Sequence, residues 1–198
     1  MLKHIQKKIN NPNKGVSFNH ADWAAVGVLQ HILGSGRALY SRGISGGTSS
    51  RLNRNLVEKN SQWIKSVQTF NLNYSDKGLF GVYGMADRGR TDEFINLIRS
   101  ELSGVSKSVT DEEITRGQRS LQSSFLFEHQ KQPKLVEFVA RQAQHSQQIL
   151  TPSEFIRNAV SKVTRSDVSR VANEILSANP TLVVVGDVDG TPILQDLS

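Results

Sequence analysis

Two aspartates near the carboxy terminus form the pattern in this sequence that most suggests chemistry. Asp187 and Asp189 stand in an Asp-x-Asp-Gly-Thr run that follows the apolar residues 182–186. At the end of a buried strand, one carboxylate can attack phosphorus while a second acts as general acid and base beside a bound Mg²⁺. The spacing therefore raises phosphoryl transfer as a hypothesis.

The same run resembles the first motif of haloacid-dehalogenase-type phosphatases. In that family a long stretch of chain after the motif supplies a lysine and further metal-binding carboxylates. Here seven residues follow Thr191, so we expect that the site is not completed in the usual order. The preferred interpretation is a strand that ends in a turn built by Asp and Gly, and a phosphatase is a minor alternative.

The histidines do not form a recognisable catalytic or metal-binding pattern. No two of the five histidines are four residues apart, His-x-x-Glu-His does not occur, and cysteine is absent. Zinc sites on one helix and thiolate chemistry need those patterns. His31 lies near the predicted end of a helix, where a partial positive charge is favourable. We therefore expect structural histidines, and no catalytic residue, metal ligand or cofactor site.

A glycine-rich stretch after the first predicted helix is the best candidate for a contact with another molecule. It holds Gly34, Gly36, Gly43, Gly46 and Gly47. It is not a dinucleotide fingerprint, because it follows a helix and Leu39 occupies the position of the third glycine. Several glycines permit close approach of the backbone to a partner or peptide. A plain flexible connector is an equally good interpretation.

The composition excludes several classes of protein. With 37% hydrophobic and 21% charged residues, this chain of 198 residues is expected to form a packed domain. No apolar run approaches the roughly 20 residues that span a bilayer. The net charge is +6, but the Lys and Arg residues are scattered and not interleaved with aromatic residues. We therefore expect no nucleic-acid partner.

Helical periodicity dominates the sequence. A helix is expected over residues 20–33, capped by Asn19 and ended by Gly34, and a short one over residues 49–59. Two capping boxes, a helix-opening proline, an acidic first turn after Thr91 and a capping serine predict the remaining helices. These begin near Thr91, Thr110, Pro133, Thr151 and Ser166.

Strand patterns are fewer. Residues 63–74 and 79–86 predict a hairpin, and residues 181–186 predict a last strand. The fold class is therefore α+β, a mainly antiparallel sheet with helices packed on one face. Residues 1–18 are expected to form a polar, frayed or truncated segment, and residues 19–198 a single domain that lacks its first strands.

Three stretches, taken together, resemble a known family. They are Val-Leu-Gln-His-Ile-Leu-Gly-Ser-Gly at 28–36, Thr-Ser-Ser-Arg-Leu at 48–52 with Thr-Phe-Asn-Leu-Asn-Tyr-Ser-Asp-Lys-Gly-Leu-Phe-Gly-Val-Tyr at 69–83, and Gly-Asp-Val-Asp-Gly-Thr-Pro-Ile-Leu at 186–194. In this order they resemble the carboxy-terminal domain of the pitrilysin-type peptidase superfamily. Within it they most resemble the core protein 2 branch of ubiquinol–cytochrome c reductase. The likeness covers about residues 20–198.

The resemblance implies a domain without peptidase chemistry. Peptidase members carry His-x-x-Glu-His zinc ligands in an amino-terminal domain, and hold substrate with an Arg and a Tyr of the carboxy-terminal domain about two helical turns apart. Arg51 and Arg54 lie in the comparable region, but the residues seven further on are Glu58 and Ser61. We therefore expect an inactive, peptidase-like domain.

The function that the resemblance implies is structural. We expect a core subunit on the matrix side of the mitochondrial inner membrane. It would be peripheral to the membrane and would assemble as a hetero-oligomer with a core protein 1-like subunit and other subunits of the complex.

The alternative is the non-catalytic, presequence-recognising subunit of the mitochondrial processing peptidase. In that relative a glycine-rich loop contacts presequences, and residues 34–47 lie at the corresponding place. Arg37 and Arg42 would repel basic presequences, and the tail at 186–194 favours the core protein.

Overall fold

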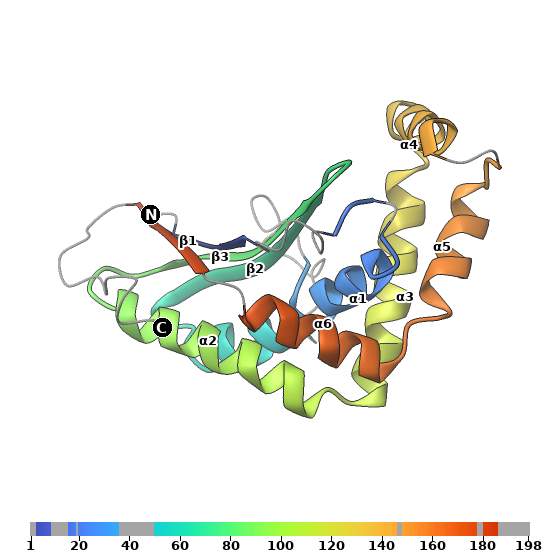
Figure 1. Cartoon of the computed structure of the whole chain (residues 1–198). Coiled ribbons are helices and arrows are strands. Elements are labelled where there is room, and N and C mark those ends of the chain that lie inside the picture. Colours follow the sequence, from blue (N-terminus) through green and yellow to red (C-terminus); the bar gives the residue numbers. More distant parts are fainter. Residues whose placement is uncertain are drawn as a thin grey trace.

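A four-stranded antiparallel sheet forms one layer of the structure. The computed structural model describes residues 3–8, 16–18, 20–35, 50–145, 148–177 and 180–185 (Figure 1). The strands are β1 (Lys3–Lys8), β2 (Ile64–Asn73), β3 (Gly78–Ala86) and β4 (Pro180–Val184), in the order β2-β3-β1-β4. The expected hairpin is β2–β3, which pair antiparallel along their length. The predicted α+β class is confirmed.

Strand β1 corrects the expectation for the start of the chain. Lys3–Lys8 does not form a frayed segment but lies between β3 and β4, where Ile5 is opposite both Val82 and Leu182. The domain therefore does have an opening strand. The prediction failed because a run of Lys, His and Gln lacks the apolar pattern of a central strand, whereas backbone pairing on both sides needs no particular side chain.

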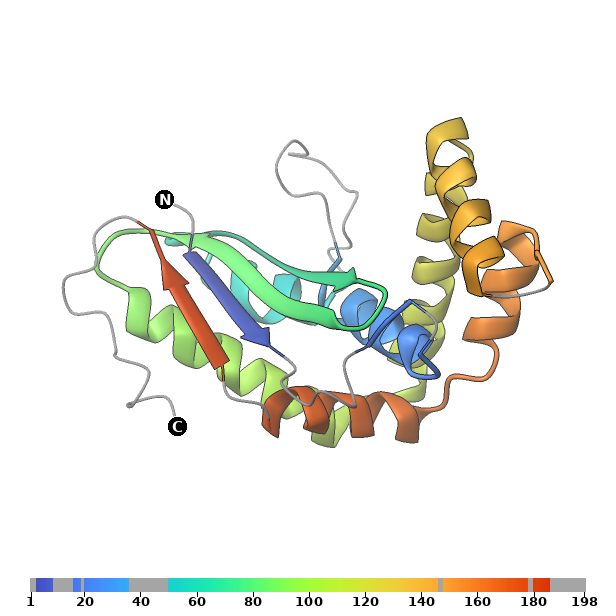
Figure 2. The ribbon, with the colours of Figure 1, turned by 45° about the horizontal axis from the view of Figure 1, so that its top comes forward.

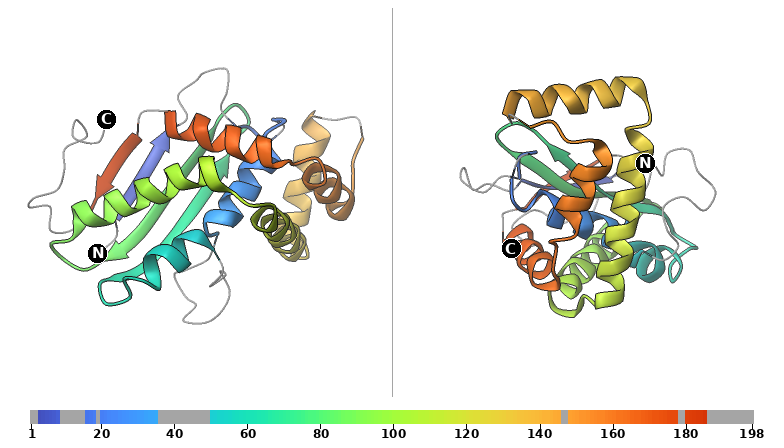
Figure 3. Two further views of the ribbon diagram at one scale, coloured as in Figure 1. Left: turned by 90° about the horizontal axis from the view of Figure 1, so that it is seen from below. Right: turned by 90° about the vertical axis from the view of Figure 1, so that its right-hand side faces the viewer.

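The helices cover one face of the sheet and continue beyond one end of it. Helices α2 (Thr91–Ser108) and α6 (Arg165–Ser177) lie side by side under the strands (Figures 2 and 3). Helix α1 (Trp23–Leu33) lies between β2 and α3 (Asp111–Glu128), and a π-helical turn spans Asn53–Val57. Helices α4 (Gln132–His145) and α5 (Pro152–Val160) are grouped with α3 at the end away from β4 (Figure 1).

The main core lies between the sheet and the helices. Phe80 and Val82 of β3 point to the helical layer and are 1% and 2% exposed. A Cβ on Gly84, in the same strand, would stand 2.5 Å from the Phe94 ring of α2. Leu52 and Leu56 are buried, as expected for the short helix that holds them. Burial of these apolar side chains is the main driving force for this two-layer arrangement.

The helix caps agree with the sequence at two places and differ at a third. Thr110 and Thr151 form full capping boxes, each with the glutamate three residues later. At α6 the cap is Thr164 rather than Ser166, since the Asp167 N–H donates to Thr164 Oγ1 and the Thr164 N–H donates to Asp167 Oδ2. Asn19 lies outside the described residues, and α1 begins after Asp22.

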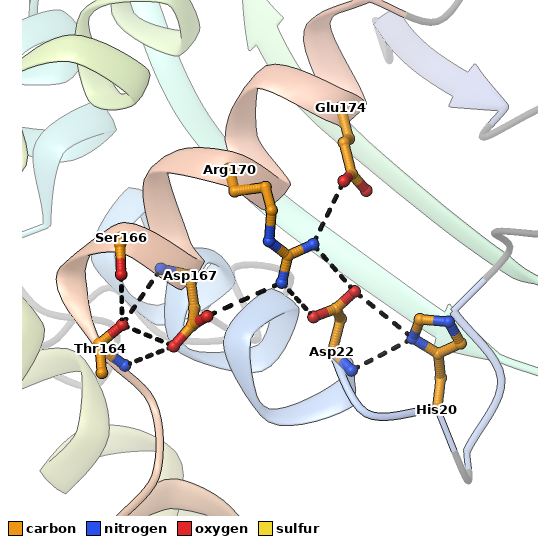
Figure 4. Close-up of polar contacts among 7 residues, drawn as sticks. All are labelled: His20, Asp22, Thr164, Ser166, Asp167, Arg170 and Glu174. Carbon is orange, nitrogen blue, oxygen red and sulfur yellow. Dashed lines mark hydrogen bonds and ion pairs between the residues drawn. The ribbon is translucent and has the colours of Figure 1, made fainter.

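An ion-pair network joins the start of α1 to α6. The guanidinium of Arg170 binds both carboxylate oxygens of Asp22 and also reaches Glu174, with 3.2 Å between Arg170 Nη1 and Glu174 Oε1 (Figure 4). Hydrogen bonds from Arg170 to Asp22 raise the pKa of the guanidinium, which strengthens its hold on the proton. The network fixes the two helices at the surface of the core.

Glycines allow α1 and α3 to approach closely. A Cβ on Gly117 of α3 would be 2.9 Å from Ile32 Cγ1 and 3.2 Å from the Val28 carbonyl oxygen, and one on Gly27 of α1 would be 2.9 Å from Leu121 Cδ2. These separations are shorter than ordinary van der Waals contact. The close crossing of α1 and α3 therefore depends on glycine, which has no side chain, at positions 27 and 117.

Substitution of Gly117 tests this crossing. Gly117→Ala should lower the free energy of unfolding by about 1–3 kcal/mol, because α1 must move away from α3. Gly104→Ala in α2 is the matched control, since its nearest neighbour there, Arg51 Nη1, is 4.0 Å away. The control should be neutral or stabilising by up to about 1 kcal/mol from helix propensity. Urea unfolding followed by circular dichroism measures both, and equal effects would contradict the close crossing.

Candidate functional site

The two ends of the glycine-rich stretch meet in the structure. A Cβ on Gly34 would lie 3.0 Å from the hydroxyl oxygen of Ser50, although these residues are sixteen positions apart in the sequence. Of the predicted contact glycines, Gly34 is described, whereas Gly36, Gly43, Gly46 and Gly47 lie outside the described residues. The part of the candidate site that the structure describes is therefore the base of the loop.

The amino-terminal end of the loop is bound to the sheet. Gly34 ends α1 with a φ of 140°, a conformation that favours glycine, and its N–H donates to the Gln30 carbonyl. Thr69 of β2 donates to the Gly34 carbonyl oxygen twice, from its backbone N–H at 2.8 Å and from its hydroxyl at 2.9 Å. Because Thr69 is buried, these bonds fix where the chain leaves α1.

His31 links the same end of the loop to α3. Its Nδ1 is 2.7 Å from the hydroxyl oxygen of Ser35 and 2.8 Å from that of Ser120. Burial lowers the pKa of His31 to about 4, so the ring is neutral at pH 7. The prediction that His31 carries positive charge at the end of α1 is therefore wrong. A base with so low a pKa is also poorly matched to activating either serine near neutral pH.

The carboxy-terminal end of the loop is bound to α3 by a buried ion pair. Arg51 donates from Nε to Glu113 Oε1 at 2.7 Å and from Nη2 to Glu113 Oε2 at 2.6 Å. The same guanidinium donates to the backbone oxygen of Ser108 at 2.7 Å and to its hydroxyl at 3.3 Å. The side chains of Arg51 and Glu113 are only 9% and 7% exposed. A two-pronged contact of this kind is specific to arginine.

Glu113 has two tasks at this position. Its Oε2 also accepts the backbone N–H of Thr110, which completes the capping box of α3. Burial raises the pKa of Glu113, but the hydrogen bonds from Arg51 and Thr110 outweigh burial and hold the pKa below its ordinary value. The carboxylate is therefore ionised at neutral pH.

The residues compared with the substrate-holding Arg and Tyr are not arranged for that task. The donors of Arg51 are directed to Glu113 and Ser108. Arg54 is half-exposed and its Nη2 is 4.0 Å from Glu113 Oε1, while Glu58 accepts a hydrogen bond from Asn53. Ser61 is exposed. Arg51 therefore serves the fold at the base of the loop.

Other candidate chemistry is not supported by the described residues. They contain no group of three or more His, Cys, Asp or Glu side chains that could hold a metal ion. Among them no helix is long and apolar enough to cross a membrane. Asp187 and Asp189 lie outside the described part of the chain, as does Ser45, which stands between Gly43 and Gly47 in Gly-x-Ser-x-Gly spacing.

Sequence reasoning missed the partners that hold the loop. The capping box identified Glu113 as a local cap, but its pairing with Arg51 spans 62 positions. Thr69 and Ser120 carried no signal beyond their place in a strand and a helix. A buried Arg calls for an acidic partner, but the burial of Arg51 is visible only in the structure, so the sequence held no signal for this pair.

A family model supports the likeness along more than half of the chain. The model described as "Peptidase M16 inactive domain" matches residues 10–121, which include α1, both ends of the glycine-rich loop, the β2–β3 hairpin and Glu113. The chain is also 38% identical over 179 residues to the mitochondrial-processing peptidase subunit alpha-2 of Dictyostelium discoideum. It is 26% identical over 185 residues to the cytochrome b-c1 complex subunit 2 of Mus musculus.

These alignments cover most of this chain but a minor part of the relatives. They include 90% and 93% of the chain, and 39% and 40% of the two relatives. Among solved structures, the inactive peptidase domain of a Bordetella parapertussis protein matches with a TM-score of 0.68 and 16% identity. That match covers 92% of this chain and 91% of the other. At this identity the likeness shows the fold.

The neutral His31 predicts a pH dependence of stability. The unfolded chain binds a proton at the ordinary pKa of 6.5 and the folded chain only near 4, so stability is lost as the pH falls between these values. From pH 7 to pH 5 the loss from this residue should be about 2 kcal/mol. His31→Asn, which retains a hydrogen-bonding group near Nδ1, should lose correspondingly less stability over that interval in urea titrations. Parallel pH profiles of the two proteins would refute a buried, neutral His31.

Proposed function

The chain belongs to the peptidase M16 inactive domain family, as its resemblance to pitrilysin-type proteins predicts, and from this premise we propose that it works in a non-catalytic subunit of a mitochondrial processing peptidase. Such a subunit recognises presequences and leaves cleavage to a zinc-binding partner. The observation that carries this proposal is the similarity to the Dictyostelium discoideum alpha-2 subunit along nine tenths of the chain.

The comparisons support this function better than the one that sequence analysis ranked first. The tail at 186–194 favoured a core subunit, but that stretch lies outside the described residues and outside the family match. The described loop base, in contrast, fits peptide recognition. Thr69 and Arg51 hold the two ends of a glycine-rich loop at one point on the domain, so the loop can present backbone donors and acceptors to a peptide.

The charge of the loop limits how a presequence would bind. Presequences are basic and amphipathic, and Arg37 and Arg42 belong to the loop. Like charges repel, so we expect the loop to contact the apolar face and backbone of the peptide.

A core subunit of ubiquinol–cytochrome c reductase is the second candidate. It is favoured by the similarity to the Mus musculus cytochrome b-c1 complex subunit 2 over almost the whole chain. Both candidates share a mitochondrial location and a hetero-oligomeric partner. They differ in the partner itself, which is a catalytic peptidase subunit in the first and a core protein 1-like subunit at the inner membrane in the second.

A peptide titration tests the proposed function. A fluorescent presequence peptide should bind the full chain, and Gly46→Pro should weaken binding about tenfold because proline restricts the loop backbone and removes a donor. Gly46→Ala is the matched control and should change affinity less, since it keeps the N–H. A scrambled peptide of the same charge should bind weakly. No preference of the unaltered chain for the presequence over the scrambled peptide would argue against presequence recognition.

A further inference from the structure

The β2–β3 hairpin has an apolar face that none of the described helices covers. Helices α2 and α6 lie under the opposite face, toward which Phe80 and Val82 point (Figures 2 and 3). Alternate residues of a strand point to opposite sides of a sheet. Leu79, Tyr83 and Met85 therefore lie on the side of β3 that is turned away from these helices.

Strand β2 extends this apolar surface. Its Leu72 is opposite Leu79, and its Phe70 is opposite Gly81 in the antiparallel register. The ring of Phe70 contacts the ring of Tyr83, with 6.2 Å between the ring centroids, so both rings lie on one side of the sheet. We define the outer hairpin face as the apolar side chains that share this side, which are Phe70, Leu72, Leu79, Tyr83 and Met85.

The composition of the outer hairpin face is unusual for a surface in contact with water. An antiparallel sheet with one solvated face commonly alternates apolar residues on the inner side with polar residues on the outer side. In β3 the residues of both sides are apolar, and Leu72 of β2 is 45% exposed. Exposed apolar patches are typical of surfaces at which another molecule binds.

The outer hairpin face carries no charged residue, although the chain as a whole is basic. The charged residues of the segment 64–87 are Lys65, Asp76, Lys77 and Asp87. Lys65 and Asp87 form an ion pair at one end of the hairpin, with 3.1 Å between Nζ and Oδ2, and Asp76 and Lys77 lie between the strands at the other end. A basic ligand that lies along the strands would therefore meet no like charge there, in a chain with a net charge of +6.

The dimensions of the outer hairpin face suit a single helix. Neighbouring strands lie about 4.8 Å apart, so two strands with their side chains form a band about 10 Å wide, close to the diameter of an α-helix. The nine residues of β3 extend about 30 Å, the length of about five helical turns. An amphipathic helix can therefore lay its apolar side along the hairpin while its polar side stays in water.

We propose that the outer hairpin face binds the apolar side of a helical stretch of the presequence. A presequence is amphipathic and basic, so its apolar residues would pack on Phe70, Leu72 and Leu79 while its cations remain in water. The proposal rests on the proposed function but not on the glycine-rich loop, because every side chain of this face belongs to the described part of the chain.

Polar substitutions on the outer hairpin face test the proposal on the full chain. The double variant Leu72→Gln, Leu79→Gln makes a directly opposed apolar pair polar. Its affinity for a fluorescent presequence peptide should fall about tenfold, because two apolar contacts are lost. Val136→Gln is the matched control, since Val136 of α4 is an apolar residue that is 67% exposed, and it should leave the affinity unchanged.

Circular dichroism checks that each variant is folded, and Leu72→Gln alone replaces the double variant if that variant does not fold. A folded hairpin variant with the affinity of the unaltered chain overturns the proposal. An equal loss of affinity in Val136→Gln also overturns it, because exposed apolar residues anywhere on the chain would then have the same effect.

Photo-crosslinking locates the bound peptide without any substitution in the chain. A presequence peptide with a photoreactive leucine analogue on its apolar side should crosslink to residues 68–85. The same analogue on the polar side of the peptide should crosslink there less. Crosslinks of the apolar side that are confined to other segments of the chain overturn the proposal.

This proposal and the proposed function fail in different ways. If the unaltered chain binds the presequence no better than a scrambled peptide of the same charge, the proposed function is wrong, and the outer hairpin face has no presequence to bind. If the presequence is preferred but the hairpin variant keeps its affinity and the crosslinks lie elsewhere, the proposed function stands and only the assignment of this face is wrong.

Discussion

The buried ion pair between Arg51 and Glu113 connects parts of the chain that are far apart in the sequence. It joins the return of the glycine-rich loop to the first turn of α3, and the same carboxylate caps that helix through Thr110. Helix α3 in turn packs against α1, because the two helices cross closely at Gly117. The position of α1 fixes where the loop begins at Gly34. The loop base, the start of α3 and the crossing of two helices thus depend on one another.

Local patterns in the sequence predicted much of this fold, because they report local physics. The hairpin of β2 and β3, the capping boxes at Thr110 and Thr151, and the helix stop at Gly34 all follow from interactions within a few residues. Strand β1 was missed because its residues are mostly polar and lack the apolar pattern of a central strand. Backbone pairing on both sides holds it in the sheet. Helix α4 has an apolar stripe, yet Phe138 is buried while Val136 is 67% exposed. Periodicity shows that a helix has an apolar face, but not how much of that face its neighbours cover.

For the candidate site, the sequence predicted which segment forms it but not which residues hold that segment in place. Glycine content marked the loop, while the residues that fix its ends were found only in three dimensions. Arg51 illustrates the difference, since sequence analysis compared it with a substrate-holding arginine and the structure directs its donors to Glu113 and Ser108. His31 is a second example. Its place near the end of a helix favours the protonated ring, but burial lowers its pKa and keeps the ring neutral. Both residues act in the support of the loop, which is consistent with membership of an inactive peptidase family.

The central claim is that this chain works in a processing peptidase, and purification of the tagged protein from mitochondria of its source organism tests it most directly. The partners that copurify are examined by visible absorption and by cleavage of a presequence peptide. We predict a preparation without haem bands that cleaves the peptide when zinc is present. Absorption bands of b- and c-type cytochromes, without peptide cleavage, would contradict the account and assign the chain to the respiratory complex.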